Sequence, residues 1–135
     1  MTVDASAFLA RWHRVVAEKN LGALGDILAL DVTLGAPPYW TKLQGRDVVH
    51  HLLGIIITLV EDFTYRREWI SGSELALEFT GRVGDRELQG IDLVTLDGDG
   101  RVCNIDVMIR PINALIALRD SVAPKMAEFL SSTKG

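Results

Sequence analysis

The stretch that most constrains this chain is residues 90–111, which reads as a β-hairpin. Two β-rich runs, Ile91–Leu96 and Val102–Ile109, flank Asp97-Gly98-Asp99-Gly100, and Asp and Gly favour turns because they tolerate positive φ. Side chains alternate across a strand, so one hairpin face should be apolar around a single carboxylate, Asp92. The expected members of that face are Gly90, Asp92, Val94, Cys103, Ile105, Val107 and Ile109.

Four β-rich segments in the second half of the chain predict an antiparallel meander. They are residues 65–70, 75–82, 87–96 and 102–109. Their connections are short and turn-like, and short connections join antiparallel strands. Helices gathered on one face of such a curved sheet form an α+β cone with a pocket between the two layers.

The turns also predict which residues face one another. With Gly84-Asp85 as a two-residue turn, Leu77 should pair with Asp92, and Phe79 with Gly90. If Leu96 lies opposite Arg101, Asp92 should also face Ile105. The register of segment 65–70 stays open, because a one-residue change exchanges the two faces of a strand. The alternatives for its cavity face are Arg67 with Trp69, or Glu68 with Ile70.

Helical periodicity in the first half of the chain predicts the helices that cover the sheet. The expected elements of the first half are helices at 5–19, 23–30 and 46–60 and a short strand at 32–34. The third helix has two adjacent apolar stripes, which must be buried on more than one side. A C-terminal helix should follow Pro111 and be interrupted at Pro124.

Length, charge and composition limit the domain number, the partners and the location that can be expected. The 135 residues suit one domain, 1–135, and the net charge of −4 argues against a nucleic-acid partner. No apolar run is long enough to span a bilayer, so no membrane partner is expected. Cys103 is the single cysteine, and no secretion signal is apparent. A cytoplasmic location is therefore expected.

These features together resemble the nuclear transport factor 2-like (NTF2-like) superfamily, which includes ketosteroid isomerases, SnoaL-type cyclases and limonene epoxide hydrolases. The resemblance covers nearly the whole chain. It rests on Leu-Xaa-Xaa-Asp-Val-Thr at 28–33, Gly45-Arg46, Ala76-Leu77-Glu78-Phe79, Gly90-Ile91-Asp92, Asp-Gly-Arg-Val at 99–102 and Arg110-Pro111. It implies an NTF2-like cone in which a curved antiparallel sheet, mixed at its edge, packs against three N-terminal helices plus a C-terminal helix.

The resemblance transfers to the site only in part. Asp92 matches the cavity aspartic acid that ketosteroid isomerases keep neutral and use as a hydrogen-bond donor. The isomerase's general base would fall near Ala36, which cannot do that work, and its first-helix tyrosine near Trp12. The epoxide hydrolase pattern needs an Asp-Arg-Asp relay, for which Arg67 is available in one register.

Metal chemistry has little support in the sequence. His50 and His51 are adjacent, so on a helix they point about 100° apart and do not readily share one ion. The ligand set that zinc usually requires is missing. We expect no metal and no cofactor, and one of the two histidines at the pocket mouth.

Two functions remain open at this point. The first is a cofactor-independent isomerase, cyclase or hydrolase that acts on a small apolar organic molecule, with Asp92 as general acid/base and a raised pKa. The second is a non-catalytic ligand-binding or dimeric interaction module. The mixed outer face of the sheet favours a homodimer. The candidate substrate-binding residues are Trp12, Tyr39, Trp40, His51, Leu77, Phe79, Ile105 and Val107.

Overall fold

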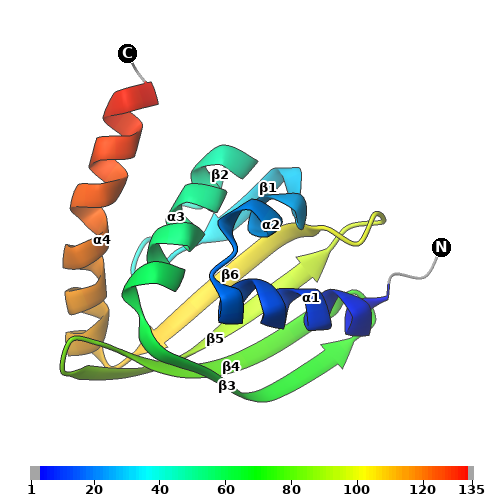
Figure 1. Ribbon diagram of the computed structural model, residues 1–135, viewed down its shortest axis with the longest axis horizontal. Helices are drawn as coiled ribbons and strands as arrows, with labels where there is room; N and C mark the ends of the chain where they lie inside the picture. The colour runs from blue at the N-terminus through cyan, green and yellow to red at the C-terminus, as the bar shows by residue number, and fades with distance from the viewer. Residues whose placement is uncertain (1–3, 134–135) are drawn as a thin grey trace.

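The computed structural model describes residues 4–133, which form four helices and one six-stranded sheet (Figure 1). The elements in chain order are α1 (Ala5–Glu18), α2 (Leu21–Asp26), β1 (Leu28–Gly35), β2 (Leu43–Gln44), α3 (Arg46–Leu59), β3 (Glu61–Ser71), β4 (Glu74–Val83), β5 (Arg86–Leu96), β6 (Val102–Arg110) and α4 (Ile112–Thr133).

The sheet has the strand order β2-β1-β6-β5-β4-β3. Neighbouring strands run antiparallel except β1 and β6, which are parallel. The first three helices cover one face of the curved sheet, and α4 stands beside α3 at one end of it (Figure 1). The predicted α+β cone, with an antiparallel sheet that is mixed toward one edge, is confirmed.

The helices differ from the prediction at two places. The second helix was expected over 23–30, but it ends at Asp26, because Leu28 begins a strand that pairs with Val102 of β6. Pro124 was expected to interrupt the last helix, yet α4 continues through it. The apolar side chains of α4 pack against the rest of the molecule, and such packing outweighs local propensity.

The two predicted β-hairpin registers had different outcomes. The β4–β5 register is confirmed: Leu77 pairs with Asp92 and Phe79 with Gly90. The β5–β6 register is wrong by two residues, because Asp92 pairs with Val107 rather than Ile105. A β-bulge at Cys103 and a longer turn cause the shift. A shift of two keeps Ile105, Val107 and Ile109 on the expected face.

The open register of the first meander strand is settled by a second bulge. Tyr65 pairs with Phe79, the register then shifts, and Glu68 pairs with Leu77. Glu68 therefore faces the helices, and its carboxylate contacts His13 of α1. Arg67 points to the outer face, where it binds the buried Glu78 through two hydrogen bonds of 2.8 and 2.7 Å.

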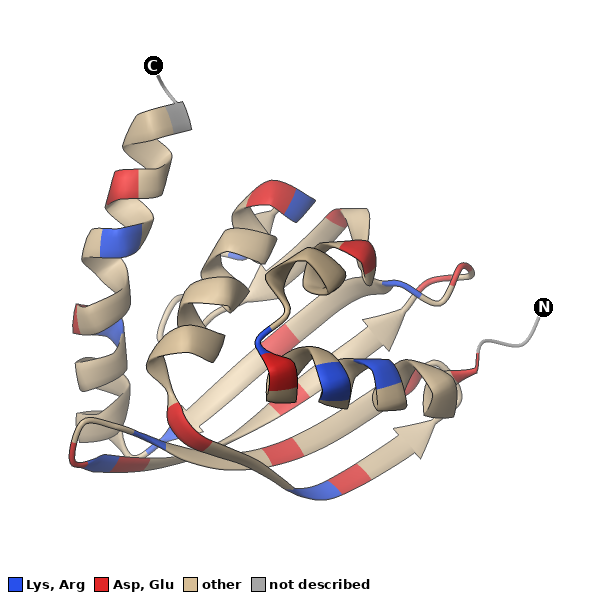
Figure 2. Ribbon diagram, viewed as in Figure 1, with Lys and Arg blue, Asp and Glu red and all other residues tan. Residues whose placement is uncertain are grey.

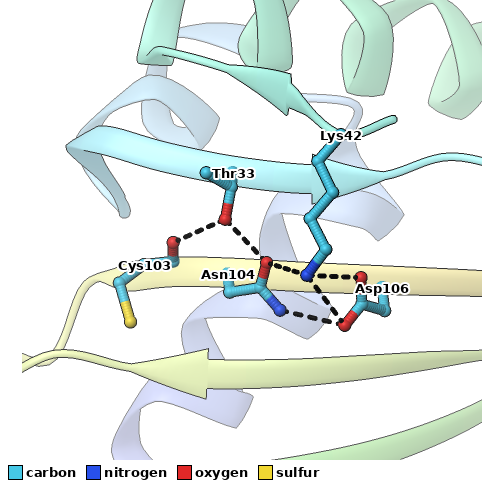
Figure 3. Close-up of polar contacts among 5 residues, drawn as sticks. All are labelled: Thr33, Lys42, Cys103, Asn104 and Asp106. Carbon is cyan, nitrogen blue, oxygen red and sulfur yellow. Dashed lines mark hydrogen bonds and ion pairs between the residues drawn. The ribbon is translucent and has the colours of Figure 1, made fainter. Parts of the chain in front are cut away.

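A polar cluster joins β1, β6 and the segment before β2 on the outer face of the sheet (Figure 3). The Lys42 ammonium lies 3.1 Å from Asp106 and donates to the Asn104 side-chain oxygen at 3.0 Å. The Thr33 hydroxyl donates to the same oxygen at 2.6 Å. Gly35 leaves room for this cluster, because a Cβ there would lie 2.4 Å from the Asp106 carboxylate.

The core lies between the helices and the inner face of the sheet. Its fully buried side chains include Leu24, Ile27, Leu28, Leu34, Leu77 and Ile105. The third helix carries charged side chains only in its first turn (Figure 2), and its apolar residues join this core. Among the described residues, no helix is long and apolar enough to cross a membrane.

Candidate functional site

A cavity of about 250 Å³ lies between the inner face of the sheet, α1, α3 and α4. Its walls are almost entirely apolar. The lining side chains that carry a polar group are Trp12, Tyr39, Thr41, Tyr65, Asp92 and Arg119. The volume is just below the roughly 300–1,000 Å³ that is usual for ligand pockets, so the cavity suits a small organic molecule.

The carboxyl group of Asp92 lines this cavity from β5, a central strand of the sheet. The residue is 6% exposed. Among residues 4–133 its oxygens have no hydrogen-bond partner, so no described protein group donates to the anion. Burial raises the pKa of Asp92 from 3.8 to about 7. Near neutral pH this side chain can therefore both give and take a proton.

A second polar group faces the same region from β3. The Trp12 indole N–H donates to the Tyr65 hydroxyl oxygen at 2.5 Å. The hydroxyl keeps its own proton, which it can donate to a ligand. Burial raises the pKa of Tyr65 well above its usual value, and the charge of Asp92 raises it further. Tyr65 is thus a neutral donor close enough to interact with the acid electrostatically.

The sequence did not single out Tyr65. Its place on the inner face depends on the strand register, which was left open, and the bulge after Tyr65 lets both Tyr65 and Glu68 face inward. Aromatic contacts with Phe63 and Phe79, at centroid distances of 5.1 and 6.5 Å, fix the ring.

The predicted site residues divide into three groups. Trp12, Tyr39, Phe79 and Val107 line the cavity together with Asp92. Leu77 and Ile105 lie in the core and do not reach the cavity. Trp40 is 96% exposed, because the segment after Pro38 turns its ring into solvent, and His51 stacks on Phe129 of α4 at 4.0 Å. Neither Trp40 nor His51 lines the cavity.

The two histidines do not share a site. The His50 ring contacts the backbone carbonyl of Leu21 at 2.5 Å, whereas His51 faces α4. Within the described part of the chain, no group of three His, Cys, Asp or Glu residues is placed to hold a metal ion.

The structure also shows where Ala36 and Arg67 lie, the two residues compared above with the isomerase base and the epoxide hydrolase arginine. Ala36 lines the cavity, so the wall carries a methyl group where a ketosteroid isomerase would be expected to keep its base. Arg67 is bound to Glu78 on the outer face, so it does not lie beside Asp92. An Asp-Arg-Asp relay built on Asp92 and Arg67 is therefore not assembled.

The last helix forms a wall that the sequence did not reveal. The lining residues of α4 are Leu115, Leu118, Arg119, Val122, Ala123, Met126 and Leu130. Its continuity through Pro124 carries this wall past the middle of α3, where Phe129 meets His51.

The chain resembles known proteins at the level of structure. It is 37% identical to a steroid delta-isomerase from Pseudomonas aeruginosa, with a TM-score of 0.88 over 96% of this chain and 97% of the other. An NTF2-like protein from Mesorhizobium loti, 17% identical, has a TM-score of 0.70 over 78% of this chain and 90% of the other. The epoxide hydrolase/cyclase-like enzyme SalBIII, 16% identical, has a TM-score of 0.66 over 79% and 91%.

No protein-family model matches the chain, and no curated protein does. Within residues 4–133, the fold and the site define an α+β cone protein whose apolar cavity holds one buried acid, Asp92. The structural similarity makes the family plain: this chain belongs to the NTF2-like superfamily.

Proposed function

We propose that the chain binds a small apolar organic molecule in its cavity and acts on it as a cofactor-independent isomerase or cyclase, with Asp92 as general acid/base. The observation that carries the proposal is the buried carboxyl group of Asp92, which has no hydrogen-bond partner among residues 4–133 and a pKa of about 7. An ionisable group held in an apolar cavity with a strongly shifted pKa is typical of catalytic sites. The similarity to a steroid delta-isomerase supports the same class.

The chemistry follows from two donors, one of which is the acid. The neutral carboxyl group of Asp92 gives its proton to the carbonyl oxygen of the ligand while water takes a proton from the α-carbon, and the Tyr65 hydroxyl donates a hydrogen bond to the same oxygen. The Asp92 carboxylate then takes its proton back as water protonates the γ-carbon of the enol. In a cavity with few competing dipoles, such donors stabilise negative charge on that oxygen more than water does. Trp12 holds the Tyr65 oxygen and so leaves the tyrosine proton directed toward the ligand.

The hydrolase alternative has less support than the isomerase or cyclase. An epoxide hydrolase of this superfamily is expected to use an Asp-Arg-Asp relay, and Arg67 is held by Glu78 on the other face of the sheet. A non-catalytic binding protein is the second candidate. The methyl group of Ala36 in the cavity wall favours it, because no second carboxylate stands there.

Turnover of a β,γ-unsaturated ketone tests the proposal. The substrates are 3-cyclohexenone and a β,γ-unsaturated steroid ketone, and conversion to the conjugated enone is followed by absorbance. The wild type should convert at least one of them, faster below pH 7 than above it, because the acid must be protonated. Asp92→Asn should lower the rate by about 100-fold or more. The matched control is Asp85→Asn, in an exposed turn, which should leave the rate unchanged.

Two results separate the candidates. Equal turnover in the wild type and Asp92→Asn eliminates Asp92 as the acid/base. Binding of an apolar ligand by both proteins, with no turnover by either, favours the binding protein.

We also propose that two copies of the chain associate through the outer face of the sheet. Trp69, Leu93 and Met108 are exposed there on β3, β5 and β6. β5 and β6 are adjacent, and Ala76 of β4 lies between Trp69 and Leu93. A contiguous exposed apolar patch is typical of an interface. Light scattering should show a dimeric mass for the wild type and a monomeric mass for Leu93→Lys. Ile116→Lys, on α4, should leave the mass unchanged, and a monomeric wild type would refute the association.

A cytoplasmic location stays a proposal based on the single Cys103.

A further inference from the structure

The charged groups at the cavity are placed asymmetrically. Among the described residues that line it, one is a carboxylic acid, Asp92, and one is a cation, Arg119. The acid is 6% exposed, whereas the side chain of Arg119 is 41% exposed. The cavity therefore has a protonatable acid in its buried part and a cation where the wall meets solvent.

The guanidinium of Arg119 is weakly engaged by the protein itself. Its contacts are with Asp120, the next residue, at 3.3 Å from Nε and 3.2 Å from an Nη. Both contacts reach the same oxygen, Oδ1, so the fork of the guanidinium is not matched by a two-oxygen partner. The Asp120 side chain is itself largely exposed, and exposed ion pairs contribute little.

The aliphatic part of Arg119 continues the apolar wall that Leu115, Leu118 and Val122 form on the same helix. An arginine in this position covers apolar surface with its stem while its charged head stays in water. A ligand that fills the cavity would present its outer end to that head. The apolar walls offer such an end no other cation among the described lining residues.

We propose that the cavity takes an apolar molecule that carries one anionic group, a carboxylate or sulfonate, which the guanidinium of Arg119 binds at the mouth of the cavity. The apolar body lies against α3 and α4, and the opposite end reaches toward Asp92 and Tyr65. This inference names the ligand class of the proposed function and rests on the binding part of that function.

Two dyes with one apolar skeleton test the inference: 8-anilinonaphthalene-1-sulfonate and its uncharged parent, N-phenyl-1-naphthylamine. Fluorescence titration of the complete protein gives a Kd for each. Arg119→Met should weaken binding of the sulfonate about tenfold, the loss expected for one charge-assisted hydrogen bond. It should change binding of the parent dye less than twofold. Arg119→Lys should retain part of the preference, and Arg14→Met, on the exposed side of α1, should retain all of it.

Each other result overturns the inference. Equal weakening of both dyes assigns Arg119 to wall packing alone. Three results leave no role for a cation at the mouth. They are an unchanged sulfonate affinity in Arg119→Met, a loss of sulfonate affinity in Arg14→Met as large as that in Arg119→Met, and a wild type that binds neither dye. Ketone turnover by Asp92→Asn is a separate readout. If Arg119→Met does not change the preference for the sulfonate while Asp92→Asn lowers turnover, the anion site alone is overturned. If Arg119→Met abolishes the preference while Asp92→Asn leaves turnover unchanged, only the catalytic proposal is overturned.

Discussion

The buried acid should make the stability of this protein depend on pH in a specific way. Burial raises the pKa of Asp92 from 3.8 to about 7 in the folded protein. The folded state therefore holds this proton more tightly than the unfolded chain does. The stability that this group contributes is fully present below pH 3.8 and is lost as pH rises through 7. A pKa raised from 3.8 to about 7 corresponds to about 4 kcal/mol.

Asp92→Asn isolates this contribution, because an amide does not titrate and all other groups cancel in the comparison. About 3 kcal/mol of the effect should fall between pH 5 and pH 9. Urea denaturation at both pH values measures it as the change in the free energy of unfolding of the wild type relative to the variant. As pH rises, the free energy of unfolding of Asp92→Asn should increase relative to that of the wild type.

A matched substitution controls for removal of a carboxyl group in general. Asp85→Asn, in the exposed β4–β5 turn, should change the free energy of unfolding by less than about 0.5 kcal/mol at both pH values. The reasoning is refuted if the wild type and Asp92→Asn lose stability in parallel from pH 5 to pH 9. That result would mean that water or a donor reaches the carboxylate.

Three further predictions concern the sheet and its polar contacts. Gly90→Ala should cost about 1–3 kcal/mol in urea denaturation, because its Cβ would lie 2.4 Å from a phenylalanine ring atom and 2.7 Å from a backbone oxygen; Gly98→Ala, in open space, should cost far less. The bound Arg67 guanidinium holds the pKa of Glu78 at about 2, so the wild type loses the stability of this ion pair as pH falls from 4.5 to 2. Glu78→Gln should therefore lose less free energy of unfolding than the wild type over that pH range. An equal loss in both proteins would contradict this. Trp12→Phe removes the donor to Tyr65 and should lower the free energy of unfolding by about 1 kcal/mol, and an unchanged midpoint would show that the indole N–H adds nothing.

The sequence predicted those parts of the fold that local turn chemistry determines. The two-residue turn at Gly84-Asp85 specified the β4–β5 register, and with it the partner of Asp92. The β5–β6 register was missed because the bulge at Cys103 depends on packing on both sides of the sheet, which no local pattern encodes. The prediction that Asp92 shares a face with Ile105, Val107 and Ile109 was still correct, because a register shift of two residues keeps each side chain on the same face of the sheet.

Long-range partners explain most of the other differences. Leu28 looked helical because its strand partner, Val102, is more than seventy residues away in the chain. Tyr65 was missed for a related reason: its inward direction is set by pairing with Phe79 before a bulge. The exposure of Trp40 could not be deduced either, since two adjacent aromatics after a proline pair suit a cavity rim and a solvent-facing loop equally well.

The cavity combines a rigid part and an exchangeable part, which matters for engineering. Asp92 stands on a central strand whose neighbours are paired along its length, whereas Val122 and Met126 belong to one helix at the end of the described chain. Replacing that helix with the equivalent segment of another superfamily member should change the shape of the cavity and leave the Asp92 carboxyl group in place. Libraries confined to α4 are therefore the economical route to variants with new ligand preferences.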